Sequence, residues 1–463
     1  MAQRVVAPRR HTCAVAGPPM SAVQQRTIAT LMGSQMLGGV ALTAGIAVMA
    51  LLAEDVSGST SLAGLAGSAQ VLGGALIAIP MARAMAARGR RPGLVLGYGL
   101  AVLGTVGIIV AGIIRSFPLL LVAAAVFGGA STSNSQARYA AADLAAPAHR
   151  GRDLGLVVWA TTIGSAVGPN LVGPGGALAT AVGVPPLVGT FLLSFVALGL
   201  GIALIQWRLR PDPLLLARSM EEEAGALAMP PQAAGPAGPT GPEGSVGPGA
   251  APVVSGAPVV SGADKGGIIA GLRSIAAHPG APLGLLTLTL GHAVMVSVMV
   301  VTPLHMSHGG ATLTVIGFVI SLHIIGMYAF SPITGLAVDR LGAKAVALLG
   351  SCVLMVATLL TSMAPRGEST IVVAGLFLLG LGWSCTLVSG STLLVAAIPV
   401  RERPSSQGAS DLVMGLVAAA GGASAAYIIA VASFHVLSLA AMGLAAAIGV
   451  AALASRARVA GPS

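Results

Sequence analysis

Two histidines lie deep within long apolar stretches, where an ionisable side chain is costly and becomes a functional candidate. His292 lies near the middle of the stretch 283–304, and His323 lies near the middle of 312–337. Histidine has an ordinary pKa of about 6.5, so it can exchange a proton close to neutral pH. The alternative is a neutral imidazole that donates one hydrogen bond between helices, worth about 0.5–1.5 kcal/mol. We predict that His292 and His323 are proton-coupling groups, and the packing alternative stays open for each.

Asp143 is a third candidate for proton coupling. It follows the apolar stretch 117–141, and Arg138, Arg150 and Arg152 are its candidate counter-ions. If both histidines are packing residues, coupling has to move to Asp143 or to Asp411, or transport is not linked to protons.

A set of polar side chains falls on one helical face of the stretch 117–141. Ser131 and Arg138 are seven residues apart, and two more polar residues follow Ser131 at three and four residues, the spacing of one helical face. Lipid would not tolerate such a face, so it is expected to look into a central cavity. Arg138 is close to the end of the stretch, and its alternative is to extend to the lipid headgroups. The predicted cavity residues, two of them from other stretches, are Gln35, Ser131, Asn134, Arg138 and Trp383.

Twelve apolar stretches must position these side chains. A bilayer core requires about 20 apolar residues per helix, and each stretch is long enough to cross. The stretches are continuously apolar, and backbone groups in lipid must be satisfied within their own segment, so helices are expected rather than a barrel. The predicted spans are 28–53, 62–84, 92–114, 117–141, 154–180, 186–207, 283–304, 312–337, 344–364, 370–397, 408–431 and 434–455.

The basic residues divide almost completely between the two sides of this arrangement. If the spans alternate in direction, 22 of the 24 Lys and Arg residues fall on one side, and only Arg115 and Arg366 fall on the other. Cytoplasmic loops retain Lys and Arg, so we expect a multi-pass protein of the cell membrane with both termini in the cytoplasm. The net charge of +10 therefore indicates contact with anionic headgroups, not a nucleic-acid partner.

The stretch between the sixth and seventh spans has a different composition. Residues 208–282 are rich in Pro and Gly and are predicted to be a disordered cytoplasmic linker. The linker separates two six-helix bundles, 28–207 and 283–455, with cytoplasmic tails at 1–27 and 456–463. The predicted fold is an all-α membrane protein of 12 spans, in two bundles related by a pseudo-twofold axis. This parallel-repeat layout is described for one large class of secondary transporters.

One loop carries a specific motif. Gly335 is followed after three residues by Asp339 and Arg340, and then by Gly342 and the basic Lys344. This segment resembles the loop motif of the major facilitator superfamily. The resemblance implies that the loop stabilises one conformation by pairing charges with a neighbouring helix. The alternative is that its basic residues only anchor the chain at the cytoplasmic surface.

The partners implied for this loop are Asp411, at the start of the eleventh span, and Arg401 or Arg403. The corresponding loop of the first half keeps its glycine turn and its basic residues, Gly89-Arg90-Arg91, but Ala86 stands where the motif has its acid. A mechanism that needs an acidic latch in the first half is therefore not supported.

The fifth span contains a second motif. Gly164, Gly168 and Pro169 resemble the glycine–proline motif of exporters in the superfamily, especially drug/proton antiporters. The two glycines are one turn apart and allow another helix to approach closely, while the proline permits a bend. The alternative is ordinary packing of small residues. This resemblance favours export.

The expected function is secondary active transport, not enzyme catalysis. The sequence has no phosphate-binding loop and no zinc-protease helix, and its three cysteines show no metal spacing, so no cofactor or metal is expected. We predict a monomer that exports small amphipathic molecules in exchange for protons by alternating access. Two alternatives remain: a proton-linked importer of a small metabolite, and a non-transporting membrane scaffold or sensor. The missing acid at Ala86 is the feature that favours the scaffold.

Overall fold

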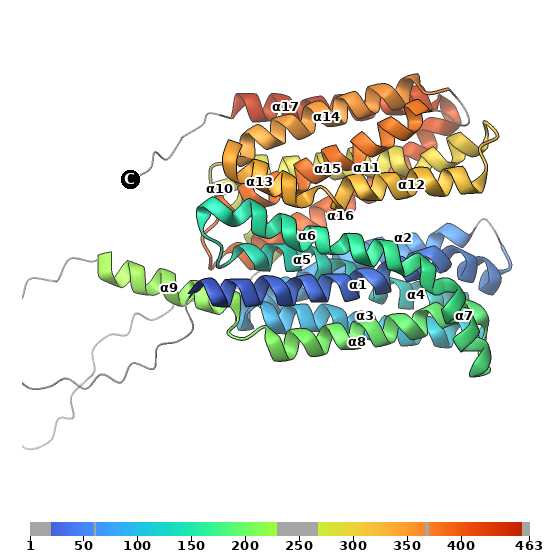
Figure 1. Ribbon diagram of the computed structural model, residues 1–463, viewed down its shortest axis with the longest axis horizontal. Helices are drawn as coiled ribbons and strands as arrows, with labels where there is room; N and C mark the ends of the chain where they lie inside the picture. The colour runs from blue at the N-terminus through green and yellow to red at the C-terminus, as the bar shows by residue number, and fades with distance from the viewer. Residues whose placement is uncertain (1–19, 60–61, 229–266, 366–369, 456–463) are drawn as a thin grey trace, which may run out of the picture.

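In the computed structural model, residues 20–59, 62–228, 267–365 and 370–455 are described, and the regular elements in these ranges are helices. They run side by side along the longest dimension of the molecule (Figure 1). In chain order the helices are α1 (Met20–Ser57), α2 (Ala63–Arg88), α3 (Arg90–Ile114), α4 (Phe117–Phe127), α5 (Gly129–Ala142), α6 (Arg150–Val167), α7 (Val172–Ala181), α8 (Gly189–Arg208), α9 (Pro213–Ala228), α10 (Ile268–Ala277), α11 (Ala281–Ser307), α12 (Leu313–Tyr328), α13 (Ser331–Leu341), α14 (Ala343–Met363), α15 (Thr370–Ala397), α16 (Arg403–Val431) and α17 (Phe434–Ala454).

Twelve helical segments of the described chain are long and apolar enough to cross a membrane, which confirms the predicted number of spans. Some spans consist of more than one helix. The fourth runs through α4 and α5, the fifth through α6 and α7 with the short 3₁₀ turn Gly168–Leu171 between them, and the eighth mainly through α12 and α13.

The spans form two bundles, as the sequence predicts. Helices α1 to α8 pack together in the lower bundle of Figure 1, and α11 to α17 form the upper one. The bundles meet mainly through two helix pairs, α6 with α13 and α2 with α16. These pairs join the fifth span to the eighth and the eleventh to the second, so exchanging the halves maps one pair onto the other. This interface is the one that a pseudo-twofold repeat produces.

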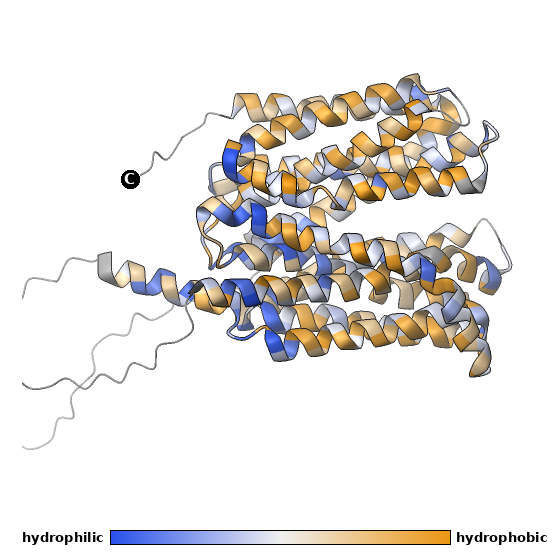
Figure 2. Ribbon diagram, in the orientation of Figure 1, coloured by the Kyte–Doolittle hydropathy of each residue, from blue (hydrophilic) through white to orange (hydrophobic). Residues whose placement is uncertain are grey.

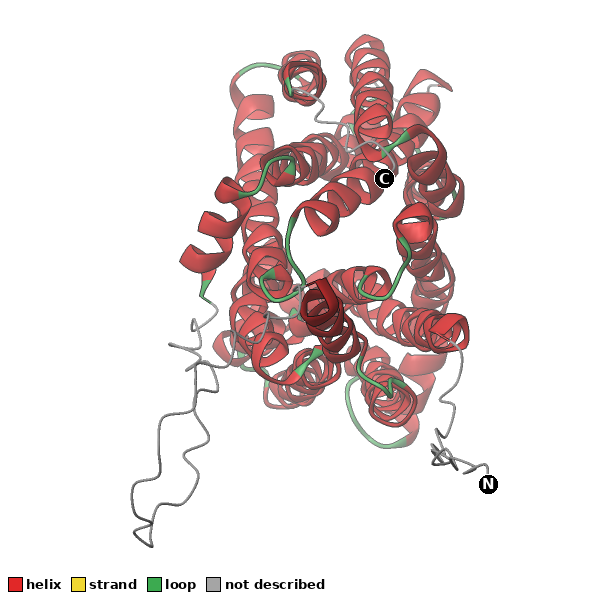
Figure 3. Ribbon diagram, turned by 90° about the vertical axis from the view of Figure 1, so that its left-hand side faces the viewer, coloured by secondary structure: helices red, strands yellow, loops and turns green. Residues whose placement is uncertain are grey.

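The polar ends of the two bundles lie on the same side of the molecule. Helix α1 begins and α17 ends at the same end of the molecule, which we call the terminal face, and Figure 3 views the bundles from this side. Hydrophilic residues concentrate at the terminal face and between the bundles next to it, while the helix flanks are apolar (Figure 2). This distribution fits helices whose sides lie in lipid and whose ends reach water.

The two bundles touch closely near the terminal face. A Cβ atom added at Gly151 would lie 2.5 Å from the carbonyl oxygen of Gly335, and one added at Gly155 would lie 2.3 Å from that of Ser331. At the other helix pair, a Cβ added at Gly408 would lie 2.5 Å from the Cβ of Ala82. Small residues bring helix backbones into direct contact in membranes. The terminal half of the interface is therefore closed.

The predicted linker 208–282 is wrong at both ends, because the chain there is helical. Pro213–Ala228 forms α9 and Ile268–Ala277 forms α10. Helix α9 buries Leu214 and Ala217 against Val400 of the second bundle, and α10 packs on α16. These apolar contacts stabilise helices that composition alone would leave unfolded. The predicted tail 1–27 is also too long, because α1 begins at Met20. Residues 1–19, the linker segment 229–266 and the C-terminal tail 456–463 lie outside the described residues.

Candidate transport site

A cavity of about 330 Å³ lies between the two bundles. Helices α1, α2, α5 and α6 line it from the first bundle, and α11, α12, α15 and α16 line it from the second. Its volume is at the lower end of the range for small-molecule sites, about 300–1,000 Å³. All five predicted cavity residues line it: Gln35, Ser131, Asn134, Arg138 and Trp383.

Helix α5 carries the polar face of the cavity, and its other faces hold it in the bundle. Ser133 donates a hydrogen bond to the carbonyl oxygen of Leu94 on α3 (3.2 Å), and Thr132 donates one to that of Gly74 on α2 (2.6 Å). Asn134 accepts a hydrogen bond from the Tyr98 hydroxyl (2.6 Å). The polar composition of α5 therefore serves two purposes, since some side chains fix the helix and others face the cavity.

A buried ion pair joins the two bundles beside the cavity. Arg138 on α5 and Asp411 on α16 lie 3.0 Å apart, with side chains only 5% and 6% exposed. Gln136 donates a second hydrogen bond to the Asp411 carboxylate (2.6 Å), and Arg138 Nε donates to Ser391 Oγ on α15 (3.2 Å). The Arg138 guanidinium also lies over the Tyr139 ring. Removing one partner of such a pair costs about 3–5 kcal/mol, because the other charge stays buried and unpaired.

This geometry corrects the prediction for Asp411, which was expected to pair with the loop around Asp339. Helix α16 begins at Arg403, five residues before the predicted start of the span, so Asp411 lies two turns inside the helix and faces α5.

Asp339 instead binds the N-terminus of α6 in the opposite bundle. Its carboxylate accepts hydrogen bonds from the backbone nitrogens of Gly151 (2.7 Å) and Arg152 (2.8 Å). A helix N-terminus has unsatisfied N–H groups and a partial positive charge, so a carboxylate stabilises it there. Arg340 is exposed, and Gly342 forms the turn with φ of +88°. The acid of this loop motif thus links the two bundles at the terminal face.

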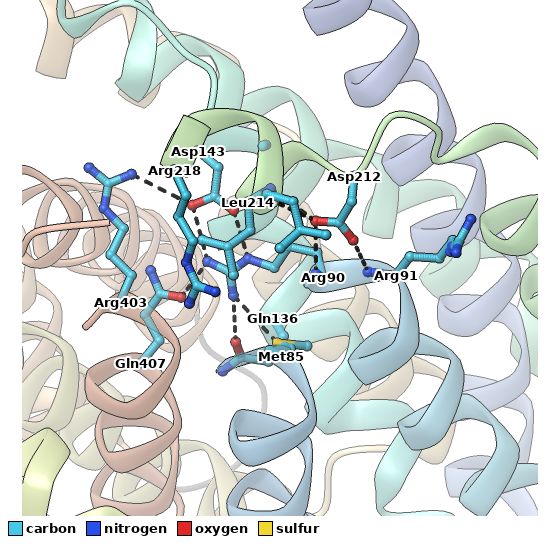
Figure 4. A network of polar contacts seen from close by, with 12 residues as sticks. Met85, Arg90, Arg91, Gln136, Asp143, Asp212, Leu214, Arg218, Arg403 and Gln407 are labelled. Atoms are coloured by element: carbon cyan, nitrogen blue, oxygen red, sulfur yellow. Dashed lines mark hydrogen bonds and ion pairs between the residues drawn. The ribbon is translucent and has the colours of Figure 1, made fainter. Parts of the chain in front are cut away.

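The first-half loop uses a different network, drawn in Figure 4. Arg90 pairs with Asp143 (2.7 Å) and donates to Gln407 of the second bundle (2.6 Å), and Arg403 lies 3.7 Å from the same carboxylate. Asp143 therefore pairs with Arg90 and Arg403, not with the counter-ions predicted from its sequence neighbours. It lies at the terminal face, fully buried.

Residues of the linker complete this network. Asp212 accepts hydrogen bonds from the backbone nitrogens of Arg90 (3.1 Å) and Arg91 (2.8 Å), at the N-terminus of α3 (Figure 4). Arg218 of α9 donates to the carbonyl oxygen of Ala86 (2.9 Å), the residue that replaces the acid of the motif. The start of the linker thus contacts the first-half loop, whose motif lacks its acid.

The two histidines occupy different environments. His292 lines the cavity, and its Nδ1 accepts a hydrogen bond from Trp383 Nε1 (2.9 Å). His323 packs against α15, where its Nδ1 lies 2.8 Å from the carbonyl oxygen of Leu376, and it is not among the cavity-lining residues. The structure therefore does not bring His292, His323 and Asp143 together.

The motif of the fifth span packs against α1. A Cβ added at Gly164 would lie 2.6 Å from the backbone of Gly39, and one added at Gly168 would lie 1.9 Å from Thr43 Oγ1. Helix α6 ends at Val167, and Pro169 lies in the following 3₁₀ turn. The glycines thus allow the close helix approach that the sequence predicts, beside the cavity.

Comparison with known proteins identifies relatives over nearly the whole chain. The sequence profile of the Major Facilitator Superfamily matches residues 31–309 and 283–462. Two Bacillus subtilis (strain 168) proteins described as uncharacterized MFS-type transporters are similar. YdeG is 35% identical, covering 90% of this chain and 88% of its own length, and YddS is 33% identical, covering 90% and 87%. The structure of the human organic anion transporter MFSD10 is similar in fold, with a TM-score of 0.67, 17% identity and coverage of 94% of this chain and 100% of its own.

Proposed function

Because the chain belongs to the major facilitator superfamily and is therefore a secondary transporter, we propose that it exports small amphipathic molecules across the cell membrane in exchange for protons. The cycle is alternating access, in which the two bundles rock around the cavity and open it to one side at a time. One chain contains both bundles, so we propose that a monomer is sufficient.

The observation that carries the proposal is the Arg138–Asp411 ion pair. It joins the bundles beside the cavity, so the pair must break when the terminal face opens. Protonation of Asp411 removes its charge and weakens the bond to Arg138, which lowers the cost of opening. A proton from the cavity can thus bias the two conformations, as coupling requires. We assign proton coupling to Asp411.

The histidines take other roles in this scheme. The indole N–H of Trp383 can only donate, so it holds His292 as a neutral imidazole with an unprotonated Nδ1. Protonating Nδ1 would break that hydrogen bond. We therefore propose that His292 contacts substrate and that His323 is a packing residue between α12 and α15. We propose that Asp143 stabilises the contacts of the terminal face through its ion pairs and takes no part in proton transfer.

The resemblance of the Gly164–Pro169 segment to exporters supports export. One observation favours import as a second candidate. In an empty, deprotonated carrier the Arg138–Asp411 pair can re-form, so the carrier can return without substrate. That return completes a symport cycle. In an antiporter the same return would let protons cross the membrane without moving any substrate.

Vesicles of both orientations test the function and its direction. Everted vesicles acidified inside are expected to accumulate members of a panel of fluorescent amphiphiles, and a protonophore should abolish the accumulation. Uptake by right-side-out vesicles acidified outside would establish import instead, and gradient-independent movement in both would contradict proton coupling.

The same vesicles test the orientation. The basic residues of the terminal face support its assignment to the cytoplasm. In a cysteine-free background, a cysteine at the exposed Ala224 of α9 should then react with an impermeant thiol reagent in everted vesicles but not in intact cells.

A further inference from the structure

One nitrogen of Arg138 is unused. Its Nε donates to Ser391, and its Nη2 lies within hydrogen-bond distance of Tyr139 and Asp411. Nη1 makes no hydrogen bond to any residue that the structure describes. It is also not fully enclosed by protein atoms. Because Arg138 lines the cavity and is 96% buried in the protein (4% exposed), Nη1 is left as a cationic donor open to the cavity.

Two further donors line the same cavity, Asn134 on α5 and His292 on α11 of the other bundle. Trp383 occupies Nδ1 of His292, so the ring proton is on Nε2, which makes no hydrogen bond within the described residues. Asn134 uses its carbonyl oxygen to accept from Tyr98, and in the described chain its amide nitrogen has no partner. Arg138 is near enough to His292 to act on it electrostatically.

The one carboxylate among the described residues that line the cavity is already occupied. Both oxygens of the Asp411 carboxylate accept hydrogen bonds, one from Arg138 and the other from Gln136. The side-chain oxygen of Gln35 is buried away from the open space. The polar groups of Arg138, His292 and Asn134 that remain open to the cavity are therefore hydrogen-bond donors. The guanidinium of Arg138 is the charged one.

Apolar side chains form much of the remaining cavity wall. They come from both bundles and include Leu42, Ile46, Val71, Leu387 and Met414. A ligand that fills the cavity thus meets one charged donor, two neutral donors and a large apolar surface.

We propose that this cavity takes a small amphipathic organic anion whose carboxylate binds Arg138 Nη1, with His292 Nε2 as a second donor. The proposal rests on the transport function above and names its substrate class. Arginine presents a planar fork that suits a carboxylate, and a charge-assisted bond inside the protein is stronger than one in water. The bound anion would share Arg138 with Asp411, so neutralising Asp411 should strengthen its binding. This linkage of anion and proton favours the import candidate, and the vesicle experiment decides the direction independently.

Equilibrium binding to the purified full-length protein tests the proposal without any gradient. The probes share one apolar body: cyclohexaneacetate, its methyl ester and cyclohexaneethylamine. Trp383 lines the cavity and reports binding by its fluorescence, once Trp159 and Trp207 are replaced by Phe. The carboxylate is expected to bind at least about tenfold more tightly than the ester or the amine, a difference of about 1.4 kcal/mol.

The variants separate charge recognition from folding. Arg138→Gln should remove the preference for the carboxylate, Arg138→Lys should retain part of it, and Asp411→Asn should raise carboxylate affinity by about tenfold. Equal binding of the three probes, no binding of the carboxylate, or unchanged affinity in Asp411→Asn would overturn the proposal. Selective carboxylate binding without gradient-driven transport would instead contradict the proposed function and leave the anion site standing.

Discussion

Asp411→Asn is expected to abolish gradient-driven transport while substrate exchange without a gradient persists. Asparagine keeps the shape of the side chain and some hydrogen bonding, but it cannot carry a charge or bind a transferable proton. Arg138 then loses its buried counter-ion, which destabilises the closed terminal face by about 3 kcal/mol. We expect gradient-driven uptake to fall at least about tenfold, because the proton no longer changes the balance between the two conformations.

Asp55→Asn is the matched control. Asp55 pairs with Arg115 at the end of the molecule opposite the terminal face, and both side chains are largely exposed, 42% and 59%. An exposed pair contributes little, so this variant should transport like the parent protein. If Asp411→Asn retains gradient-driven transport, coupling lies elsewhere, and His292→Gln becomes the next variant to examine.

Gly151→Ala is expected to hold the terminal face open and to reduce transport strongly. The added Cβ would lie 2.5 Å from the carbonyl oxygen of Gly335 and 2.8 Å from the Asp339 carboxylate, so the bundles must move apart. Overpacking of this kind costs about 1–3 kcal/mol, which shifts a two-state equilibrium about five- to 150-fold. A cysteine at Ser410, buried in the closed protein, should then react faster with thiol reagents in everted vesicles.

Gly99→Ala provides the control for the added methyl group. Gly99 is also within a helix, but a Cβ there would meet nothing within 4 Å, so transport and labelling should be unchanged. Equal labelling of the cysteine at Ser410 in Gly151→Ala and Gly99→Ala would show that the close contact at Gly151 does not control the terminal face.

The fold and part of the site follow from local sequence patterns. The number of spans follows from the length of the apolar stretches, because a stretch of that length has few alternatives to a helix in a bilayer. The cavity residues on α5 follow from helical spacing, since Ser131, Asn134 and Arg138 share one face. The contacts of Gly164 and Gly168 with α1 follow from the close approach that small residues allow.

The pairing of charges between bundles does not follow from local patterns. The polar residues before position 408 leave the first turn of α16 outside the predicted span. Asp411 is therefore placed at the start of the span and assigned to the loop around Asp339, whereas the structure buries it two turns inside the helix, against the other bundle. One available signal is that Gln407 and Asp411 are one helical turn apart and form a polar face. The partner of Asp143 is Arg90, 53 residues away in the sequence, and only the packed fold brings them together.

The distance between the bundles at the terminal face, measured against pH, tests most directly whether Asp411 couples protons to opening. Spin labels on cysteines at Ala87 of the first bundle and Ala345 of the second, both exposed, report this distance in a background without native cysteines. In the parent protein, lowering the pH should increase the population with the longer distance. In Asp411→Asn the longer distance should predominate at every pH. An identical pH dependence in the two proteins would contradict the assignment of coupling to Asp411.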